Sequence, residues 1–426
     1  MIVFAFVFVI LILLGMPIAF ALGVGVTTYI MVDTNLPYLF VVQRMFSGTD
    51  SFPLLAIPFF ILAGNLMNTG GVTRKLLEFC NVLVGHLRGG LAAVSIVGSM
   101  IFAGISGSSV ADASGLGSIL IPTMNRDGYD PEYSVAINAT SSTIGILIPP
   151  SIPMVLLATI ASASVRDLFF ASAVAGVLTG IGMLFINSYI SGKRNYPKNP
   201  RVPLKDVPRI FLSCLPAMVM PFIIIFGIIF GVVTATEAAV LAVVYSLVVG
   251  LFVYKELTPK GIYEAIIESG IQTSVVLMII ATASVLSAVL AHFLLPQALA
   301  NWALANLHNK TLILAFIAII ALITGCFIDV SPALILLGAI FYPVAVTAGI
   351  DILHFAAVLV FSLAIGLYTP PVGTTLIISS YIGKTSLAAG FRYCLPFLVE
   401  MLGILVLLIL FPILSNGLPN LLFRVN

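Results

Sequence analysis

The residues best suited to chemistry in this sequence are hydroxyl-bearing side chains that lie close to a pair of prolines. Ser106 and Ser108 belong to a Gly- and Ser-rich segment, and Pro149-Pro150 follows a second hydroxyl-rich stretch further along the chain. Because proline has no N–H to donate, the carbonyls one helical turn earlier, those of Gly145 and Ile146, lose their helical partners. Freed carbonyls in an apolar environment need a new partner, and a site made only of oxygen favours a hard cation such as sodium.

The same plan occurs a second time in the chain. Residues 325–371 align with residues 104–150 at a constant shift of 221 positions without a gap, and 13 of the 47 aligned residues are identical. Many of the shared residues are glycine or proline, so the repeat preserves backbone shape. In the second copy Thr369 precedes Pro370-Pro371 and supplies a hydroxyl where the first copy has Ile148. These features predict two similar but unequal cation sites.

Two other interpretations remain open for these segments. Glycine and proline are common in transmembrane helices, where small residues also serve helix packing, but duplication beside hydroxyls favours a binding site. Gly104-Ile105-Ser106-Gly107 also matches the Gly-x-Ser-Gly of rhomboid-type intramembrane proteases, whose serine works with a histidine on another helix. The aligned segment 325–328 has no serine, and a protease gives no reason to repeat the proline pair. We therefore expect a protein that is not an enzyme.

Few ionisable residues lie in apolar surroundings, and those few are candidates for function because a charge in lipid is costly. Asp329 lies at the tip of the second copy and is the strongest candidate for a functional side chain. The alternative is that it forms only a structural hydrogen bond. Asp112 and Glu237 are further candidates that could instead cap helix starts. For Asp130 and Asp351, which precede expected helices, we expect the capping role.

Composition places all of these residues in a membrane protein. Of the chain, 61% is hydrophobic and 8% charged, with a mean hydropathy of +1.21, whereas a soluble domain is about a quarter charged. The net charge of +2 gives no indication of nucleic-acid binding, and four scattered cysteines indicate neither a metal site nor a disulfide framework. Together with the two repeat segments, the apolar runs predict about ten to twelve crossings. These runs are residues 2–31, 52–67, 91–102, 168–190, 210–231, 237–254, 271–290, 312–324 and 387–413.

The chain divides into two halves joined by its most polar stretch. Residues 193–209 hold six basic residues, one acid and four prolines, and the positive-inside rule predicts that this linker is cytoplasmic. Each half is expected to hold a re-entrant helical hairpin and a Pro-broken helix, whereas residues 210–254 could cross the membrane once or twice, which leaves the orientation of the repeats open. The first half (1–192) is expected to contain a hairpin at about 104–127 and a broken helix at about 131–163. The second half (210–426) is expected to contain a hairpin at about 325–348 and a broken helix at about 351–382. Amphipathic surface helices are expected at 72–87 and 293–308.

These motifs together resemble the large membrane subunit of TRAP transporters, the tripartite ATP-independent periplasmic family. The resemblance covers essentially the whole chain and is carried by Pro58–Gly64 (PFFILAG), Gly104–Asp112 (GISGSSVAD), Ile148–Ser151 (IPPS), Thr234–Ala238 (TATEA) and Thr369–Gly373 (TPPVG). It implies a multi-pass protein of the bacterial inner membrane that imports an organic acid with a sodium gradient. It also implies an elevator mechanism, in which a transport domain of hairpin tips and broken helices moves against a scaffold.

The resemblance also implies binding residues and partners. A periplasmic binding protein would deliver the acid, and a small four-helix membrane subunit is expected as a separate chain because no extra helices precede Met1. The sialic-acid members resemble the chain more than the C4-dicarboxylate members do, so the expected cargo is N-acetylneuraminate, with a C4-dicarboxylate as the alternative. The residues carried over are Ser106, Ser108, Gly145, Ile148 and Pro150 for a first sodium site, Gly325, Gly366, Thr369 and Val372 for a second, and Ser108, Asp329 and Thr374 for the substrate.

Overall fold

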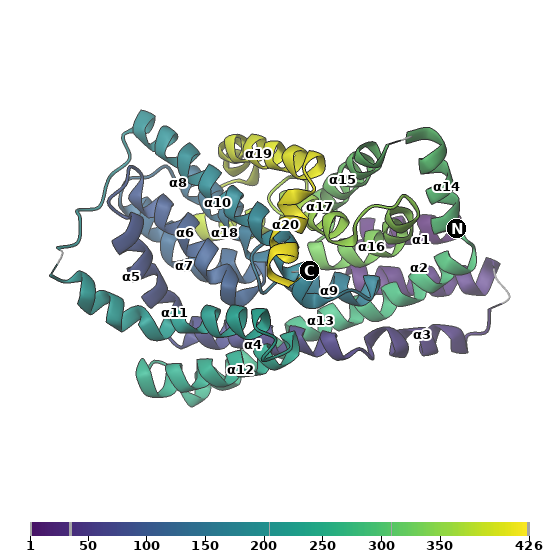
Figure 1. Ribbon diagram of the computed structural model, residues 1–426, viewed down its shortest axis with the longest axis horizontal. Coiled ribbons are helices and arrows are strands. Elements are labelled where there is room, and N and C mark those ends of the chain that lie inside the picture. The colour runs from purple at the N-terminus through teal and green to yellow at the C-terminus, as the bar shows by residue number, and fades with distance from the viewer. Residues whose placement is uncertain (1, 34–35, 204, 308, 424–426) are drawn as a thin grey trace.

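The structure is helical in all the parts of the chain that it describes. The computed structural model covers residues 2–33, 36–203, 205–307 and 309–423 (Figure 1), and in these ranges it contains no strand. The predicted all-α membrane fold is confirmed. Among the described residues, 8 helices are long and apolar enough to cross a membrane, fewer than the predicted crossings. The difference arises because several apolar runs form shorter helices, such as hairpin arms and halves of broken helices.

The first group of helices forms an outer layer, of which α3, α4, α11, α12 and α13 lie along the lower part of Figure 1 and α1, α2 and α14 at its right end. In this layer α13 packs against α2, α3 and α4, and α12 packs against α4 and α11. Its members are α1 (Ile2–Leu13), α2 (Ile18–Asp33), α3 (Leu39–Thr49), η1 (Phe52–Leu55), α4 (Ala56–Thr69), α5 (Val72–Val84), α11 (Val207–Ile229), α12 (Ala235–Val248) with its continuation η3 (Val249–Val253), α13 (Pro259–His292) and α14 (Leu295–Leu307).

The remaining helices form a repeat core that contains both copies of the duplicated segment. Each copy contributes a helical hairpin, a helix that is interrupted near its proline pair, and a longer closing helix. The first copy consists of α6 (Gly90–Ser106), α7 (Ser109–Arg126), α8 (Pro131–Ser141), η2 (Ser142–Ile146), α9 (Ile152–Ala161) and α10 (Val165–Arg194). The second copy consists of α15 (Lys310–Phe327), α16 (Val330–Thr347), α17 (Ile352–Gly366), α18 (Thr374–Gly383) and α19 (Leu387–Leu410), followed by α20 (Ile413–Phe423).

The two copies enter the core from opposite ends of the molecule. The end of α9 reaches the base of the second hairpin, where the Tyr342 hydroxyl donates to the Ala161 carbonyl at 3.1 Å. Conversely, the end of α18 reaches the start of α8, where a Cβ at Gly383 would overlap Val135. Figure 1 shows α6 and α7 toward one end and α15 and α16 toward the other. The repeats are therefore inverted, a point that the sequence left open.

The start of the chain differs from the long apolar helix expected there. The run breaks at Gly15, whose φ of +81° ends α1, and Pro17 precedes the first turn of α2. The helix α1 then folds back on α2, and a Cβ at Gly25 would lie 3.3 Å from the Phe4 ring. Neither of these helices is among those long enough to span.

Three other expectations from the sequence can be compared with the helices observed. The region 210–254 contains two helices of spanning length, Val207–Ile229 and Ala235–Val253, which resolves the open count in favour of two. The expected surface helices correspond to α5 and α14, each of 13 residues and too short to span, although His308 lies outside the described residues. The linker is shorter than expected because α10 extends to Arg194 and α11 starts at Val207; residue 204 lies outside the described residues.

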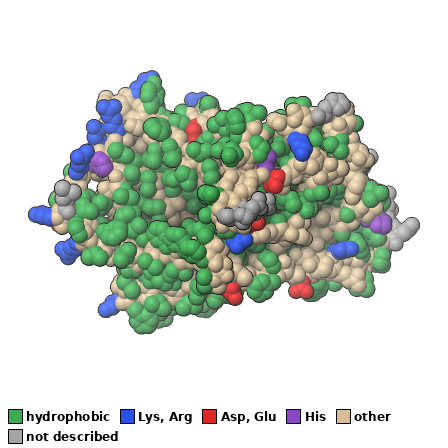
Figure 2. Space-filling view, viewed as in Figure 1, with side chains coloured by type: hydrophobic (Ala, Val, Ile, Leu, Met, Phe, Trp, Pro, Cys, Tyr) green, Lys and Arg blue, Asp and Glu red, His purple; other side chains and the backbone are tan. Residues whose placement is uncertain are grey.

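The basic residues of the connection between α10 and α11 lie at one end of the molecule. Figure 2 shows Lys and Arg side chains gathered at the end where this connection runs in Figure 1, beside the base of the first hairpin. Large green areas cover most of the face shown, as expected for helices that contact lipid. The four cysteines are free, and only Cys326 is not fully buried, which agrees with their interpretation as small hydrophobic residues.

Candidate functional site

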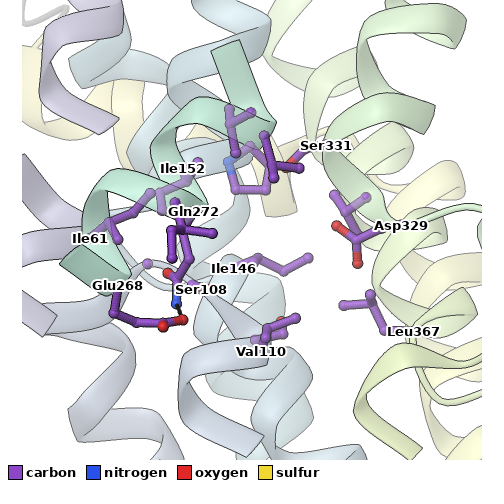
Figure 3. Close-up of a pocket in the computed structure, with 17 residues that line it drawn as sticks. Ile61, Ser108, Val110, Ile146, Ile152, Glu268, Gln272, Asp329, Ser331 and Leu367 are labelled. Carbon is purple, nitrogen blue, oxygen red and sulfur yellow. Dashed lines mark hydrogen bonds between the residues drawn. The ribbon is translucent and has the colours of Figure 1, made fainter. Parts of the chain in front are cut away.

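The tips of the two hairpins face each other across a cavity of about 390 Å³. One wall comes from Ser108 and its neighbours at the start of α7, and the opposite wall from Asp329 at the start of α16. Figure 3 shows Asp329 across the cavity from Ser108, with Ile146 between them. The start of α9, at Ile152, completes the floor. Three helix N-termini therefore meet at one cavity, and each carries a partial positive charge of its backbone N–H groups.

The first tip depends on a glycine in the left-handed conformation. Gly107 has a φ of +61°, and a Cβ there would lie 2.8 Å from the Pro150 carbonyl oxygen. The Gly107 carbonyl accepts a hydrogen bond from the Ile152 N–H at 3.2 Å, which joins the tip to the start of α9. Ser108 then begins α7 as its N-cap, with its hydroxyl accepting from the Ala111 N–H at 3.4 Å. The turn thus brings the hairpin tip directly against the proline pair.

A buried carboxylate lies directly behind this tip. Asp112 has no exposed surface, and its Oδ1 accepts a hydrogen bond from the Ser106 hydroxyl. Its Oδ2 has no hydrogen-bond partner and points at Gly145, where a Cβ would overlap it. An ionised carboxylate in this position needs a counter-charge. The structure thereby brings Asp112, Ser106, Ser108 and Gly145 of the sequence prediction together.

The first interrupted helix breaks at its proline pair, next to the Gly145 that Asp112 faces. The helix changes from α8 to the 3-10 turn η2 and resumes only at Ile152, and the Pro149-Pro150 bond is cis. The Ile146 carbonyl finds a partner in the Ser151 hydroxyl at 2.7 Å. The side chain of Ile148 instead packs toward α10, beside Gly176. Only the backbone oxygen of Ile148 is therefore available as a ligand.

The second tip is assembled through backbone contacts. Gly325 and Gly366 touch so closely that a Cβ at Gly366 would overlap the Gly325 backbone. The Cys326 carbonyl accepts a hydrogen bond from the Val372 N–H at 2.9 Å, the counterpart of the Gly107 contact in the first tip. The Thr369 hydroxyl donates to the Ile365 carbonyl at 2.7 Å, which leaves its oxygen lone pairs free to accept or to coordinate. The structure thus brings Gly325, Gly366, Thr369 and Val372 together.

The predicted substrate residues do not all reach the cavity. Ser108 and Asp329 line it. Thr374 lies behind Asp329, and its hydroxyl donates to Asp329 Oδ1 at 3.2 Å, but Thr374 is not a lining residue. Asp329 occupies the N-cap position of α16 without a side-chain capping bond. Thr374 therefore contacts the Asp329 carboxylate and not the cavity.

Sequence reasoning missed the wall that α13 contributes. Glu268 and Gln272 line the cavity from this helix of the outer layer, and the Gln272 side-chain amide donates to Glu268 Oε1 at 2.9 Å. Figure 3 shows this pair on the opposite side of the cavity from Asp329. The signal that could have found it is a polar pair at i and i+4 close to a long apolar run.

The remaining acidic candidates have structural partners. Glu237 forms a capping box with Thr234 at the start of α12 and lies outside the cavity between the tips. Asp351 caps α17 as expected, accepting from the N–H groups of Leu353 and His354. Asp130 does not cap α8 with its side chain, so that expectation is wrong. Its carboxylate instead accepts hydrogen bonds from Arg194, Tyr196 and Tyr393, because this corner of the core supplies donors that outcompete the helix start.

The fold and the site together define a multi-pass membrane transporter with an inverted repeat. The chain matches the family described as "Tripartite ATP-independent periplasmic transporter, DctM component" over residues 5–414. It belongs to this family of TRAP transporter large permeases, which are membrane transporters and not enzymes. The interpretation as an intramembrane protease therefore receives no support. The chain is accordingly a multi-pass protein of the bacterial inner membrane.

Curated relatives of this family are similar along almost their whole length. The chain is 35% identical over 382 residues to the sialic acid TRAP transporter large permease protein SiaM of Vibrio cholerae, covering 90% of each protein. It is 37% identical over 385 residues to the C4-dicarboxylate TRAP transporter large permease protein DctM of Pseudomonas aeruginosa, covering 88% of each. Relatives named for sialic acid and for C4-dicarboxylates are thus similarly close, and overall similarity does not separate the two cargoes.

A solved structure shares the fold at low sequence identity. The YdaH transporter of Alcanivorax borkumensis superposes with a TM-score of 0.65 over 90% of this chain and 89% of that chain, at 15% identity. At this identity the likeness concerns the fold alone. It supports the arrangement of hairpins and broken helices without bearing on the cargo.

Proposed function

We propose that this permease imports an organic acid, N-acetylneuraminate as the leading candidate, by coupling it to sodium entry. The observation that supports this most strongly is the unpartnered Oδ2 of the buried Asp112, which points at the backbone of Gly145. A bare carboxylate oxygen in a membrane core calls for a cation. The surrounding hydroxyl and carbonyl oxygens suit sodium better than a transition metal.

The first sodium site would use Ser106, Ser108, Gly145, Ile148 and Pro150, as predicted from the sequence, and Asp112 is added to this set as the charged ligand. The site fits the residues present because Gly145 leaves room where a Cβ would overlap the carboxylate. The second site would use Gly325, Gly366, Thr369 and Val372. It has no carboxylate in its set, so backbone and hydroxyl oxygens alone would hold the ion. We therefore expect the first site to bind sodium more tightly.

The cavity between the tips would hold the substrate. Its three helix N-termini can accept one carboxylate without an arginine, and Ser108, Ser109 and Ser331 line the same space. Both tips touch the cavity, so bound sodium would stabilise the walls that contact the substrate. In the proposed elevator mechanism the repeat core carries substrate and sodium past the outer layer, to which α13 belongs.

Members of this family normally work with a small permease and a periplasmic binding protein. We propose that this chain does the same, with the small four-helix subunit against the membrane-facing outer layer and the binding protein as the donor of the acid. A C4-dicarboxylate is the alternative cargo, supported by the similarity to the Pseudomonas aeruginosa permease. Both cargoes share the sodium-coupled mechanism.

The direct test is uptake into proteoliposomes that contain the chain and its small subunit, with the binding protein supplied outside. Labelled N-acetylneuraminate should accumulate only with an inward sodium gradient, and an equal potassium gradient is the matched control. A panel that includes labelled succinate decides the cargo. Uptake of all the acids at the same rate without sodium would rule out the coupled mechanism.

A further inference from the structure

The charge lining the cavity between the tips is unusual for a site that accepts an acid. Two carboxylates line it, those of Asp329 and Glu268, while none of the described lining residues is lysine, arginine or histidine. The other polar lining residues are Ser108, Ser109, Ser331 and Gln272. Only the three helix N-termini and any bound sodium can therefore balance a negative charge on the substrate.

The two carboxylates lie on different layers of the molecule. Asp329 belongs to the tip of the second hairpin, whereas Glu268 belongs to α13 of the outer layer. Figure 3 shows them on opposite sides of the cavity. An anion between the tips consequently has a carboxylate on each side.

Glu268 is an exposed residue of α13 with one side-chain hydrogen bond, formed within its own helix. Gln272, one turn along α13, donates to Glu268 Oε1 at 2.9 Å. No basic residue forms an ion pair with Glu268 among the described residues. In contrast, Glu264 one turn earlier pairs with Lys260 at 3.6 Å and does not line the cavity. Glu268 therefore faces the site with its charge uncompensated by a neighbouring side chain.

We propose that Glu268 is a specificity-determining residue that disfavours dianions and so limits the cavity to acids with a single carboxylate, preferably hydroxylated ones. This inference rests on the proposed function, since it concerns the acid bound between the tips. Repulsion between Glu268 and a ligand grows in proportion to the charge on the ligand. The helix N-termini accommodate the first carboxylate, whereas a second one meets Asp329 or Glu268 without a fixed cation. On this basis N-acetylneuraminate fits the cavity better than a C4-dicarboxylate.

The proportionality between repulsion and ligand charge distinguishes an electrostatic role of Glu268 from a purely structural one. Removing the Glu268 charge should change the affinity for a dianion by the square of the fold-change in affinity for a monoanion. The affinity for a neutral ligand should not change. We expect Glu268→Gln to improve binding about threefold for N-acetylneuraminate and roughly tenfold for succinate. N-acetylmannosamine, a neutral hydroxylated sugar, should show no change.

The experiment measures binding to the detergent-solubilised complex of this chain and its small subunit, at fixed sodium and without the binding protein. Titration calorimetry with the three ligands compares wild type, Glu268→Gln and the matched control Glu264→Gln, which should behave as wild type. Raising ionic strength with choline chloride should shrink the disadvantage of succinate in wild type and have little effect in Glu268→Gln. Equal changes for both acids, or no change, would overturn the inference while leaving sodium-dependent binding intact. If no acid binds wild type in sodium, the proposed function fails, and the inference with it.

Discussion

The two hairpin tips share a backbone arrangement but carry their acidic residues in different places. In the first tip the carboxylate of Asp112 lies one turn inside its helix and is buried against the broken helix. In the second tip the carboxylate of Asp329 lies at the helix start and faces the cavity. The aligned positions hold Ala333 and Ser108, so each tip has its acid where the other has none. Duplication thus preserved the backbone shape while the acidic residue occupies a different position in each tip. Under the proposed function, Asp112 would serve the ion and Asp329 the substrate.

The paired glycines of the broken helices show the same division. Gly145 leaves space for the side chain of Asp112, whereas Gly366 leaves space for the backbone of Gly325. A side chain can move aside when a Cβ is added, but two packed backbones cannot. The second glycine should therefore matter mainly for assembly, and the first mainly for ion binding.

The largest effect should come from Gly366→Ala. Its Cβ would overlap the Gly325 backbone, and forcing the two segments apart should cost about 3 kcal/mol of stability. We expect a clear fall in Tm of the purified protein and loss of uptake. Gly403→Ala is the matched control, because no atom lies within 4 Å of its Cβ position in the helix α19; its Tm should be unchanged or slightly higher. Equal Tm values for the two variants would contradict the close backbone packing.

The next largest effect should distinguish the carboxylate of Asp112 from that of Asp329. Asp112→Asn should raise the sodium concentration needed for half-maximal uptake at least about tenfold, because the charged ligand of the first site is lost. Asp329→Asn should instead change the KM for the acid and leave the sodium dependence nearly unaltered. Sodium titrations of uptake at saturating acid, and acid titrations at saturating sodium, measure the two effects. If both variants shift both curves alike, the tips do not divide the chemistry as proposed.

The smallest effect should come from a residue remote from both tips. Thr234→Ala removes half of the capping box that Glu237 completes at the start of α12. Because this helix start is exposed, we expect a fall in Tm of about 2 °C or less. Uptake should stay at the wild-type level, as measured in the same proteoliposomes. A strong loss of uptake with normal Tm would restore Glu237 as a functional residue.

The sequence predicted those features that depend on local backbone chemistry. The hairpin tips and helix breaks follow from the Gly- and Pro-rich repeats, because two consecutive prolines remove two successive backbone donors. Single prolines such as Pro122 and Pro343 instead lie inside continuous helices. The break before α2 was not predicted although Gly15 and Pro17 mark it. The reason is that residues 2–31 are predominantly apolar and were interpreted as one continuous run. Glu268 was missed for another reason. Its place in the cavity depends on α13 lying beside tips that are distant in the sequence, and no local pattern reports such a contact.

The partner of Asp130 shows the same limit at a smaller scale. Its position before a helix favoured capping, but Arg194 and Tyr393 approach from the ends of other helices and bind the carboxylate. Competition between a local and a distant donor is decided by the tertiary arrangement. The orientation of the repeats was also beyond the sequence, because it depended on whether residues 210–254 crossed once or twice.

The crossing of the two broken helices affects how the chain can be assembled during synthesis. Asn138 of the first copy donates to Ser379 of the second, 241 residues further along the chain, at 2.8 Å. The Thr375 hydroxyl likewise donates to the Ala139 carbonyl at 3.0 Å. The first broken helix is therefore synthesised long before the helix of the second copy that packs against it. Until the second copy is made, these polar groups must have other hydrogen-bond partners. Insertion and final packing are therefore separate events in the biogenesis of this permease.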